Sequence, residues 1–210
     1  LVPVTTILVG GLAGEIVGPS VSLLMRTLGA IINEATMLHP IPMGITVSVL
    51  MGIFLTAPIS SAAIAISLGL SGLAAGAATV GCSAQMIGFA VASYKENGVG
   101  GFLAQGLGTS MLQVPNIVRN PRIWIPPTLV SALLGPLATR VFRMENIPAG
   151  AGMGTSGLVG QIGTIAAMGT KVWPQILLLH FLLPAVLTYF CALFLRRIGW
   201  IEDGDMKLDL

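Results

Sequence analysis

The chain has 210 residues, of which 54% are hydrophobic and only 9% are charged, and its formal net charge is +2. A soluble domain carries roughly 25% charged residues, so these charges are too few to build a soluble surface. With a mean hydropathy of +0.91, the composition indicates that the lipid bilayer is the main solvent. The cations are scattered as single residues or pairs, which argues against a nucleic-acid partner.

The N-terminal part combines an uncharged apolar stretch, residues 1–14, with an amphipathic one, residues 20–38. The chain begins at Leu1 without methionine, so we expect N-terminal sequence to be missing. The polar residues of 20–38 recur at helical spacing, which is typical of a helix at the membrane interface or at a subunit contact. Glu34 in this helix is a candidate for binding a substrate hydroxyl or a coupling cation, and Glu15 is a second candidate. A solvated helix face explains Glu34 equally well.

Residues 41–93 contain no charged side chain and no histidine. A membrane-spanning helix needs about 20 apolar residues, so this stretch predicts at least two membrane-embedded elements. We expect the first over residues 41–57, bounded by prolines. The second, over residues 60–80, is rich in the small residues that allow membrane helices to pack closely.

The next segment alternates polar boundaries with apolar runs. Residues 94–98 are predicted to form a polar loop. Residues 100–118 are uncharged but contain four glycines and Pro115, which favours a re-entrant or broken helix over a straight span. Residues 123–139 are predicted to span the membrane.

The C-terminal part repeats this order. A second glycine-rich broken segment is expected over residues 148–170, followed by the cleanest span at residues 173–195 and a solvated acidic tail at residues 202–205.

If both broken segments enter and leave on one side, five basic residues share one side of the membrane and three share the other. This imbalance favours a cytoplasmic C-terminus. The first group is Lys95, Arg119, Arg122, Arg196 and Arg197, and the second is Arg140, Arg143 and Lys171.

The most informative pattern is a glycine-framed hydroxyl pair that occurs twice. Residues 106–110 read Gly-Leu-Gly-Thr-Ser and residues 152–156 read Gly-Met-Gly-Thr-Ser. Each copy is followed by a glutamine and then by a tryptophan-led apolar run with a proline about a dozen residues further on. Internal repeats over about 98–147 and 148–201 are therefore predicted, as in transporters that hold solutes at broken helices. Residues 81–85, Gly-Cys-Ser-Ala-Gln, resemble a third, diverged break, although chance explains that similarity equally well.

The two broken segments supply groups suited to an uncharged, hydroxylated solute. Helices interrupted by glycine expose backbone N–H groups, and threonine, serine and amide side chains add donors and acceptors. Helix-packing contacts are the structural alternative for such small polar residues. We predict a pseudo-two-fold axis that brings the two segments together near the middle of the membrane as equivalent halves of one site. The predicted binding residues are Thr109, Ser110, Gln113, Asn116, Thr155, Ser156 and Gln161.

His180 lies in the middle of the cleanest predicted span. Pro184 cannot donate a backbone hydrogen bond to residue 180, so a kink is expected there. His180, Pro184 and Thr188 share one helix face, and an ionisable residue within the membrane is a functional candidate. A neutral histidine bonded to a neighbouring helix is the alternative. In either case the ring is expected to face the protein interior.

One catalytic pattern competes with transport. Residues 154–157, Gly-Thr-Ser-Gly, match the motif of rhomboid-type intramembrane serine proteases, in which a serine and a histidine form a catalytic dyad. The match is four residues long, and the repeat accounts for most of it. The chain contains no P-loop, HExxH or dinucleotide fingerprint, and its two cysteines are far apart. We therefore expect no catalytic residue, no metal and no cofactor.

Four stretches carry a resemblance to a known family: residues 39–44, 106–116, 120–127 and 150–161. Together they resemble the bacterial phosphotransferase-system EIIC-like membrane family that includes perfringolysin-regulator-type proteins. The resemblance extends from about residue 10 to residue 195. It implies a sugar-permease-like domain in the bacterial cytoplasmic membrane, a homodimer, and separate EIIA and EIIB phosphocarrier proteins as partners.

The sequence thus predicts an all-α, polytopic integral membrane protein with internal repeats and glycine-broken or re-entrant helices. Residues 1–210 would form a single EIIC-like transmembrane domain. Its predicted function is permeation of a small polar solute, such as a sugar, by alternating access. A membrane-embedded ligand sensor or regulator without transport is the main alternative, and an intramembrane serine protease is a remote one.

Overall fold

The computed structural model describes Leu23, Thr27 and residues 39–208. This part of the chain is helical, and its one pairing of extended backbone is an antiparallel bridge between Gly72 and Asn146. The all-α prediction is therefore confirmed for the described residues. The predictions for Glu15, Glu34 and residues 20–38, apart from Leu23 and Thr27, lie outside them. The α-helices are α2 (Pro40–Thr56), α3 (Ser61–Ser67), α4 (Gly72–Ala92), α5 (Tyr94–Leu103), α6 (Val114–Arg119), α7 (Ile125–Pro136), α8 (Pro148–Ala151), α9 (Val159–Met168), α10 (Trp173–Ile176) and α11 (Leu183–Arg197).

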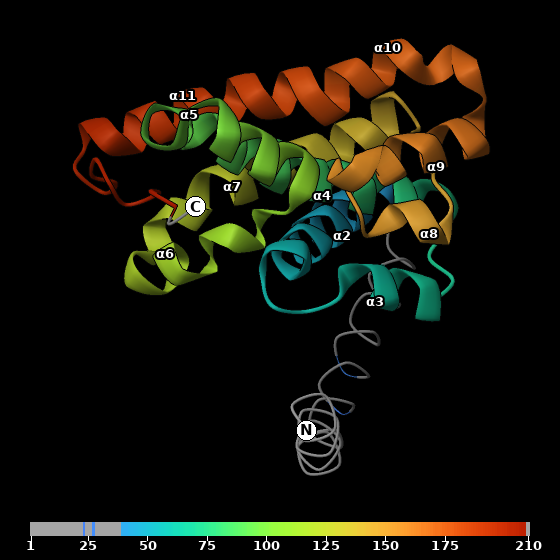
Figure 1. The fold of residues 1–210 in the computed structure, drawn as a ribbon. Helices are drawn as coiled ribbons and strands as arrows, with labels where there is room; N and C mark the ends of the chain where they lie inside the picture. The colour runs from blue at the N-terminus through green and yellow to red at the C-terminus, as the bar shows by residue number, and fades with distance from the viewer. Residues whose placement is uncertain (1–22, 24–26, 28–38, 209–210) are drawn as a thin grey trace.

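Helix α4 lies at the centre of the bundle and the C-terminal helix lies along its outside (Figure 1). Among the described residues, two continuous helical segments are long and apolar enough to cross a membrane, namely Gly72–Ala92 and Thr170–Arg197. In their most apolar windows, 94% of the first is buried but only 33% of the second. The second segment therefore presents an apolar outer surface, as a helix that faces lipid does.

Close packing of α4 explains why its small residues do not break the helix. A Cβ atom at Gly81 would overlap the carbonyl oxygen of Ser48 on α2. Ser48 in turn donates a 2.7 Å hydrogen bond to the carbonyl of Ser131 on α7. Residues 81–85 accordingly lie within a continuous α4, and the predicted third break is wrong. Glycine and serine here allow three backbones to approach one another.

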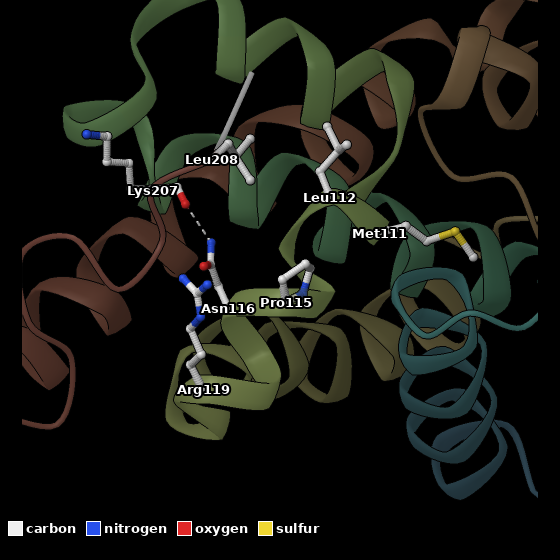
Figure 2. Close-up of a pocket in the computed structure, with 7 residues that line it drawn as sticks. All are labelled: Met111, Leu112, Pro115, Asn116, Arg119, Lys207 and Leu208. Atoms are coloured by element: carbon white, nitrogen blue, oxygen red, sulfur yellow. Dashed lines mark hydrogen bonds between the residues drawn. The ribbon is translucent and has the colours of Figure 1, made fainter.

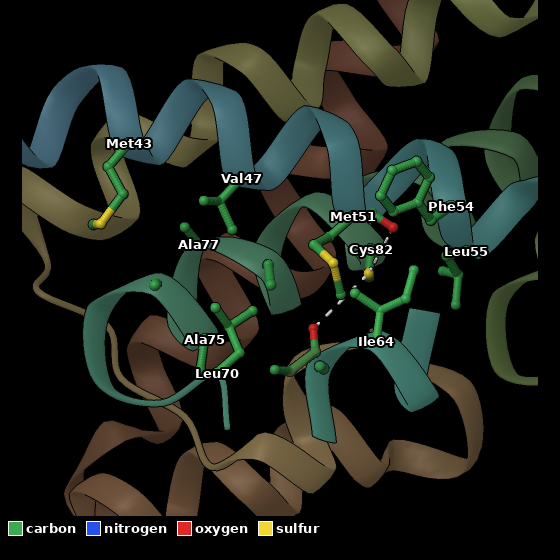
Figure 3. Close-up of a cluster of buried hydrophobic side chains, with 14 of the residues drawn as sticks. Met43, Val47, Met51, Phe54, Leu55, Ile64, Leu70, Ala75, Ala77 and Cys82 are labelled. Carbon is green, nitrogen blue, oxygen red and sulfur yellow. Dashed lines mark hydrogen bonds between the residues drawn. The ribbon is translucent and has the colours of Figure 1, made fainter. Parts of the chain in front are cut away.

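The region that we expected as one apolar element over residues 60–80 is divided. Helix α3 ends at Ser67, a short connection follows, and α4 begins at Gly72. Apolar side chains from α2, α3 and α4 fill the space between these helices, including Met51, Phe54 and Ile64 (Figure 3). The thiol of Cys82 lies in this cluster and donates a 3.4 Å hydrogen bond to the carbonyl of Met51, as expected for a buried free cysteine.

The two tryptophan-led runs start in the same way. Each begins with a 3-10 turn, Pro121–Trp124 or Thr170–Val172, and continues into an α-helix with proline in its first turn. Each also contains a π-helical stretch, Leu137–Val141 in the first run and Leu177–Leu182 in the second. The second stretch lies immediately before Pro184, where we expected the helix to kink, because proline leaves a carbonyl of the preceding turn without its usual donor.

One boundary prediction needs correction. Residues 94–98 do not form a loop, because α5 begins at Tyr94 and is only kinked at Gly98. Residues 202–204 of the acidic tail are exposed as expected, whereas Ile201 and Met206 on either side of the acidic residues are buried against the bundle. Figure 1 shows the chain turning back after α11 toward α5 and α6. The tail packs because its backbone hydrogen bonds are completed by buried side chains.

Candidate functional site

The first GTS segment, residues 106–113, is a broken helix as predicted. Helix α5 runs into a π-helical stretch, Ala104–Gly108, and the backbone becomes extended at Thr109. The Thr109 hydroxyl then accepts a 3.2 Å hydrogen bond from the Met111 N–H and caps the 3-10 turn Ser110–Gln113. This local capping is why threonine ends one helical segment and starts the next at this point.

The second GTS segment, residues 152–161, is also interrupted. Gly154 has a positive φ of 53°, and a Cβ atom there would lie 2.7 Å from the carbonyl carbon of Cys82 on α4. Only glycine combines that conformation with so close an approach. Gly157 and Leu158 follow with positive φ before α9 begins at Val159. The break is therefore confirmed here too.

The two GTS segments touch each other. The Thr155 hydroxyl donates a 2.5 Å hydrogen bond to the carbonyl of Gly106, and both residues are buried. A π-helical stretch such as Ala104–Gly108 shifts the usual backbone pairing, and the Gly106 carbonyl accepts from a side chain of the second GTS segment. The segments are thus brought together as expected, while their two-fold relation and their membrane depth remain predictions.

Ser110 belongs to a buried network that the sequence did not identify. Its hydroxyl lies 2.9 Å from the hydroxyl of Thr56 on α2. Gln85, in the middle of α4, accepts hydrogen bonds from Thr56 and from the Trp124 indole at 3.3 and 3.1 Å, and donates to Thr128. The available signal for this network was a glutamine in an otherwise apolar helix of small residues. The interpretation of residues 81–85 as a helix break missed it.

Gln113 and Asn116 hold the C-terminal tail. Gln113 Nε2 donates to Gln105 Oε1 at 2.8 Å and to the carbonyl of Met206 at 3.0 Å. Asn116 Nδ2 donates to Gln113 Oε1 and to the carbonyl of Lys207, each at 2.9 Å. The second contact appears as the dashed line in Figure 2. Both amides are therefore engaged by protein groups in this conformation.

The tail also bounds a surface cavity of about 320 Å³ beside Asn116. Figure 2 shows Pro115 and Leu112 on one side of it, and Arg119 and the tail on the other. The Asn116 amide faces this cavity but is already bonded to the tail. The cavity is thus a consequence of how the tail folds back, and it includes none of the other predicted binding residues.

Gln161 and His180 form a buried polar contact in which each side chain keeps one atom without a hydrogen-bond partner among the described residues. Gln161 Nε2 and His180 Nδ1 are 3.0 Å apart, and both side chains are buried. The other polar atom of each, Gln161 Oε1 and His180 Nε2, has no hydrogen-bond partner within the described part of the chain. Gln161 comes from the first turn of α9 and His180 from the π-helical stretch Leu177–Leu182. The predicted inward orientation of His180 is confirmed.

Thr188 is buried on the same helix face as His180, in agreement with the spacing argument. Its hydroxyl also lacks a partner among the described residues and lies against Gly88 of α4. Ser156 is only half-buried and makes no hydrogen bond to His180. The geometry thus gives no Ser–His dyad.

Asn146 is a second residue that the sequence analysis missed. Its Nδ2 donates to the Thr79 hydroxyl at 2.6 Å and to the carbonyl of Gly160 at 2.9 Å, and it lies 3.2 Å from the Thr164 hydroxyl. Asn146 therefore ties α4 to α9 and positions the helix that carries Gln161. An asparagine two residues before a proline-started helix, at the junction of the two predicted repeats, was the available signal.

Comparisons with known proteins give one match. The family described as "Phosphotransferase system, EIIC" matches residues 1–208. A search of curated proteins and a search of solved structures return no match. The EIIC component is the membrane transport part of a phosphotransferase system and is not itself catalytic. The two apolar helices, the broken segments and the match over nearly the whole chain lead to one conclusion: this chain belongs to the phosphotransferase-system EIIC family.

Proposed function

We propose that this domain carries a small, uncharged, hydroxylated solute, a sugar or a sugar-like compound, across the bacterial cytoplasmic membrane by alternating access. The observation that supports this most directly is the buried Gln161–His180 pair. Gln161 belongs to the second GTS segment, which contacts the first through Thr155. Gln161 Oε1 and His180 Nε2 are both without partners among the described residues. A polar atom buried without a partner costs about 1–3 kcal/mol, so a ligand that satisfies both gains affinity there.

The chemistry of the pair fits a hydroxyl group. Gln161 Oε1 can only accept a hydrogen bond. His180 Nδ1 accepts from Gln161 Nε2, so the neutral ring carries its proton on Nε2 and can only donate there. A sugar carries hydroxyl groups that both donate and accept, so its hydroxyls can satisfy both atoms. Among the described residues, no acidic side chain hydrogen-bonds to the pair, so the solute need not carry a positive charge.

The remaining predicted residues take different parts in the proposal. Thr109 and Ser156 are half-buried and can present hydroxyls to the solute. Thr155 and Ser110 join structural elements and would position the site. Gln113 and Asn116 would become available to solute only when the tail releases them, which alternating access can bring about. Glu34 stays our candidate for a second ionisable element.

We further propose a multi-pass topology, a homodimer, and coupling to separate EIIA and EIIB proteins, as is typical of the family. The pseudo-two-fold relation of residues 98–147 and 148–201 belongs to the same proposal. It is supported by the shared 3-10 turn, tryptophan and early proline of the two runs. A repeat of this kind supplies the two arrangements that alternating access requires.

The test is solute uptake by the full-length protein in proteoliposomes. Labelled neutral sugars are offered one at a time, with and without phosphorylated EIIA and EIIB in the bath. Uptake of at least one sugar by the wild-type protein supports the proposal. His180→Ala should lower that uptake at least tenfold, because the hydrogen bond between His180 and the solute is lost. Cys191→Ala, on the same helix but away from the pair, should leave it unchanged.

Two results would oppose the proposal. Saturable sugar binding without uptake under any condition would favour the ligand sensor. Labelling of Ser156 by a fluorophosphonate, lost in His180→Ala, would favour the protease. Normal uptake by His180→Ala would keep transport but remove His180 from the site.

A further inference from the structure

A long groove follows one face of the C-terminal helix, on the side where it meets α4 and α5. Its first part is a cavity of about 660 Å³ and its second a cavity of about 310 Å³, and Val91 of α4 lines both. Along the helix, the lining residues recur every three or four positions, which places them on one face. Figure 1 shows this helix running across α4 and α5. The stripe is Leu178, Phe181, Ala185, Tyr189, Ala192 and Arg196.

The two parts of the groove differ in chemistry. The larger part is lined only by apolar residues, including Ile87 and Phe102 on the side opposite Phe181. The smaller part is bordered by Tyr94, Lys95 and Arg196 near the end of α11. Tyrosine and basic residues are the side chains that membrane proteins place at the level of lipid headgroups. The segment Thr170–Arg197 has 28 residues and is about 42 Å long, enough to extend from the bilayer core to that level.

The basic end already holds an anion. Lys95 Nζ and Arg196 Nη1 converge on the two carboxylate oxygens of Asp203, at 2.9 and 2.8 Å. The side chains of Lys95 and Asp203 are 74% and 69% exposed, so their pairing is of the kind that water and salt weaken. Arg196 is mostly buried and is also paired with Glu96. The Asp203 carboxylate therefore marks a position where two cations can bind the oxygens of a phosphate.

We propose that this groove binds one anionic phospholipid. An acyl chain lies between α11 and α4 along Phe181 and Ala185, and the headgroup phosphate replaces Asp203 between Lys95 and Arg196. The groove is lined by apolar residues over most of its length and by basic residues only at one end. This arrangement favours a lipid over a second copy of the chain. A phospholipid has the same polarity along its own length. The site is separate from Gln161 and His180 and does not depend on the proposed transport.

The test measures lipid binding to the purified full-length protein in detergent. Dioleoyl phosphatidylglycerol and dioleoyl phosphatidylcholine are compared by melting temperature and by native mass spectrometry. Phosphatidylglycerol should bind more tightly and raise the melting temperature more. Lys95→Gln should remove most of that preference, a loss of about fivefold in affinity. Asp203→Asn should raise affinity for phosphatidylglycerol, because the competing carboxylate charge is gone.

The apolar part has its own matched pair. Ala185→Phe places a ring inside the groove and should abolish retention of both lipids. Val186→Phe places a ring at the next position, which is 40% exposed and does not line the groove, and should leave retention intact. Equal binding of the two lipids by the wild-type protein would overturn the proposal, as would unchanged lipid binding in Ala185→Phe. Dissociation of a dimer by Ala185→Phe with lipid binding intact would also overturn it, since a second copy then occupies the groove.

Discussion

The first and second GTS segments share a sequence pattern but differ in how their polar groups are satisfied. In the first, Ser110 and Gln113, together with Asn116 just after the segment, are bonded to other helices and to the C-terminal tail. In the second, Gln161 reaches His180 and both side chains keep an unpartnered atom among the described residues. The repeated motif thus accompanies a break in the helix in both copies, while the neighbours of each break decide which copy keeps polar atoms that are unpartnered in the described part of the chain.

The contact between the segments is asymmetric as well. Thr155 of the second segment donates across to Gly106 of the first, whereas Thr109 caps its own turn. Thr155 joins the two segments and Thr109 shapes a local bend. This difference can be tested by making the same substitution in each copy.

The largest difference is expected at the glycine before each threonine. Gly154→Ala should destabilise the protein by about 1–3 kcal/mol through overpacking against Cys82, and the positive φ adds to that loss. Gly108→Ala should be nearly neutral, because a Cβ atom there meets nothing within 4 Å. Thermal unfolding in detergent measures both. Equal melting temperatures for the two variants would contradict the asymmetry of the segments.

The next largest difference concerns the glutamines. Gln113→Leu removes the hydrogen bonds to Gln105 Oε1, to the carbonyl of Met206 and from Asn116. Gln105 Oε1 is left buried without a partner, so the change should lower stability by about 1–3 kcal/mol. Gln161→Leu removes one hydrogen bond, to His180 Nδ1, together with one atom that has no partner among the described residues, and should change stability less. It should instead weaken binding of the transported sugar by roughly ten- to a hundredfold.

A binding titration beside a melting curve separates the two glutamine variants. Retained sugar affinity in Gln161→Leu would remove this residue from the site. Loss of affinity in Gln113→Leu with an unchanged melting temperature would show that the first segment binds solute directly.

A smaller contrast is expected at the serines. The sequence repeat alone predicts equal behaviour. Ser110→Ala should lower stability by about 0.6 kcal/mol, the average for an interhelical hydrogen bond in membranes, because its bond to Thr56 is lost. Ser156→Ala should leave the melting temperature unchanged and lower sugar affinity by up to about tenfold. Equal changes in affinity for both variants would restore the equivalence of the two segments.

The smallest effect is expected at the tail that the first segment holds. The hydrogen bond and charge of Lys95, aided by Arg196, lower the pKa of Asp203 below its usual value. A carboxyl group with a lowered pKa in the folded state stabilises that state above its ordinary pKa, and the effect is lost as the pH falls through the lowered value. The difference in melting temperature between wild type and Asp203→Asn should therefore be small and constant near neutral pH and should close in acid. A difference that grows in acid would contradict the pairing.

Much of the architecture followed from sequence because it depends on local chemistry. The lack of charge over residues 41–93 indicated embedded helices, and glycine with threonine predicted both helix breaks. Pro184 predicted the disturbance at His180, and the absence of water in the bilayer predicted that His180 would point inward. The third break failed because Gly81 serves close packing against α2, and spacing along one chain cannot distinguish that use from a turn.

The sequence proposed residues for the candidate site but could not predict their hydrogen-bond partners. Residue type alone indicated which side chains can hydrogen-bond a solute, and the family match over residues 1–208 agrees with a transport role. Which of those side chains are already satisfied was decided by partners distant in sequence: Met206 and Lys207 for the first segment, and His180 for the second. A buried polar group has a fixed capacity for hydrogen bonds, and only the tertiary structure determines whether another part of the protein fills it or leaves it open.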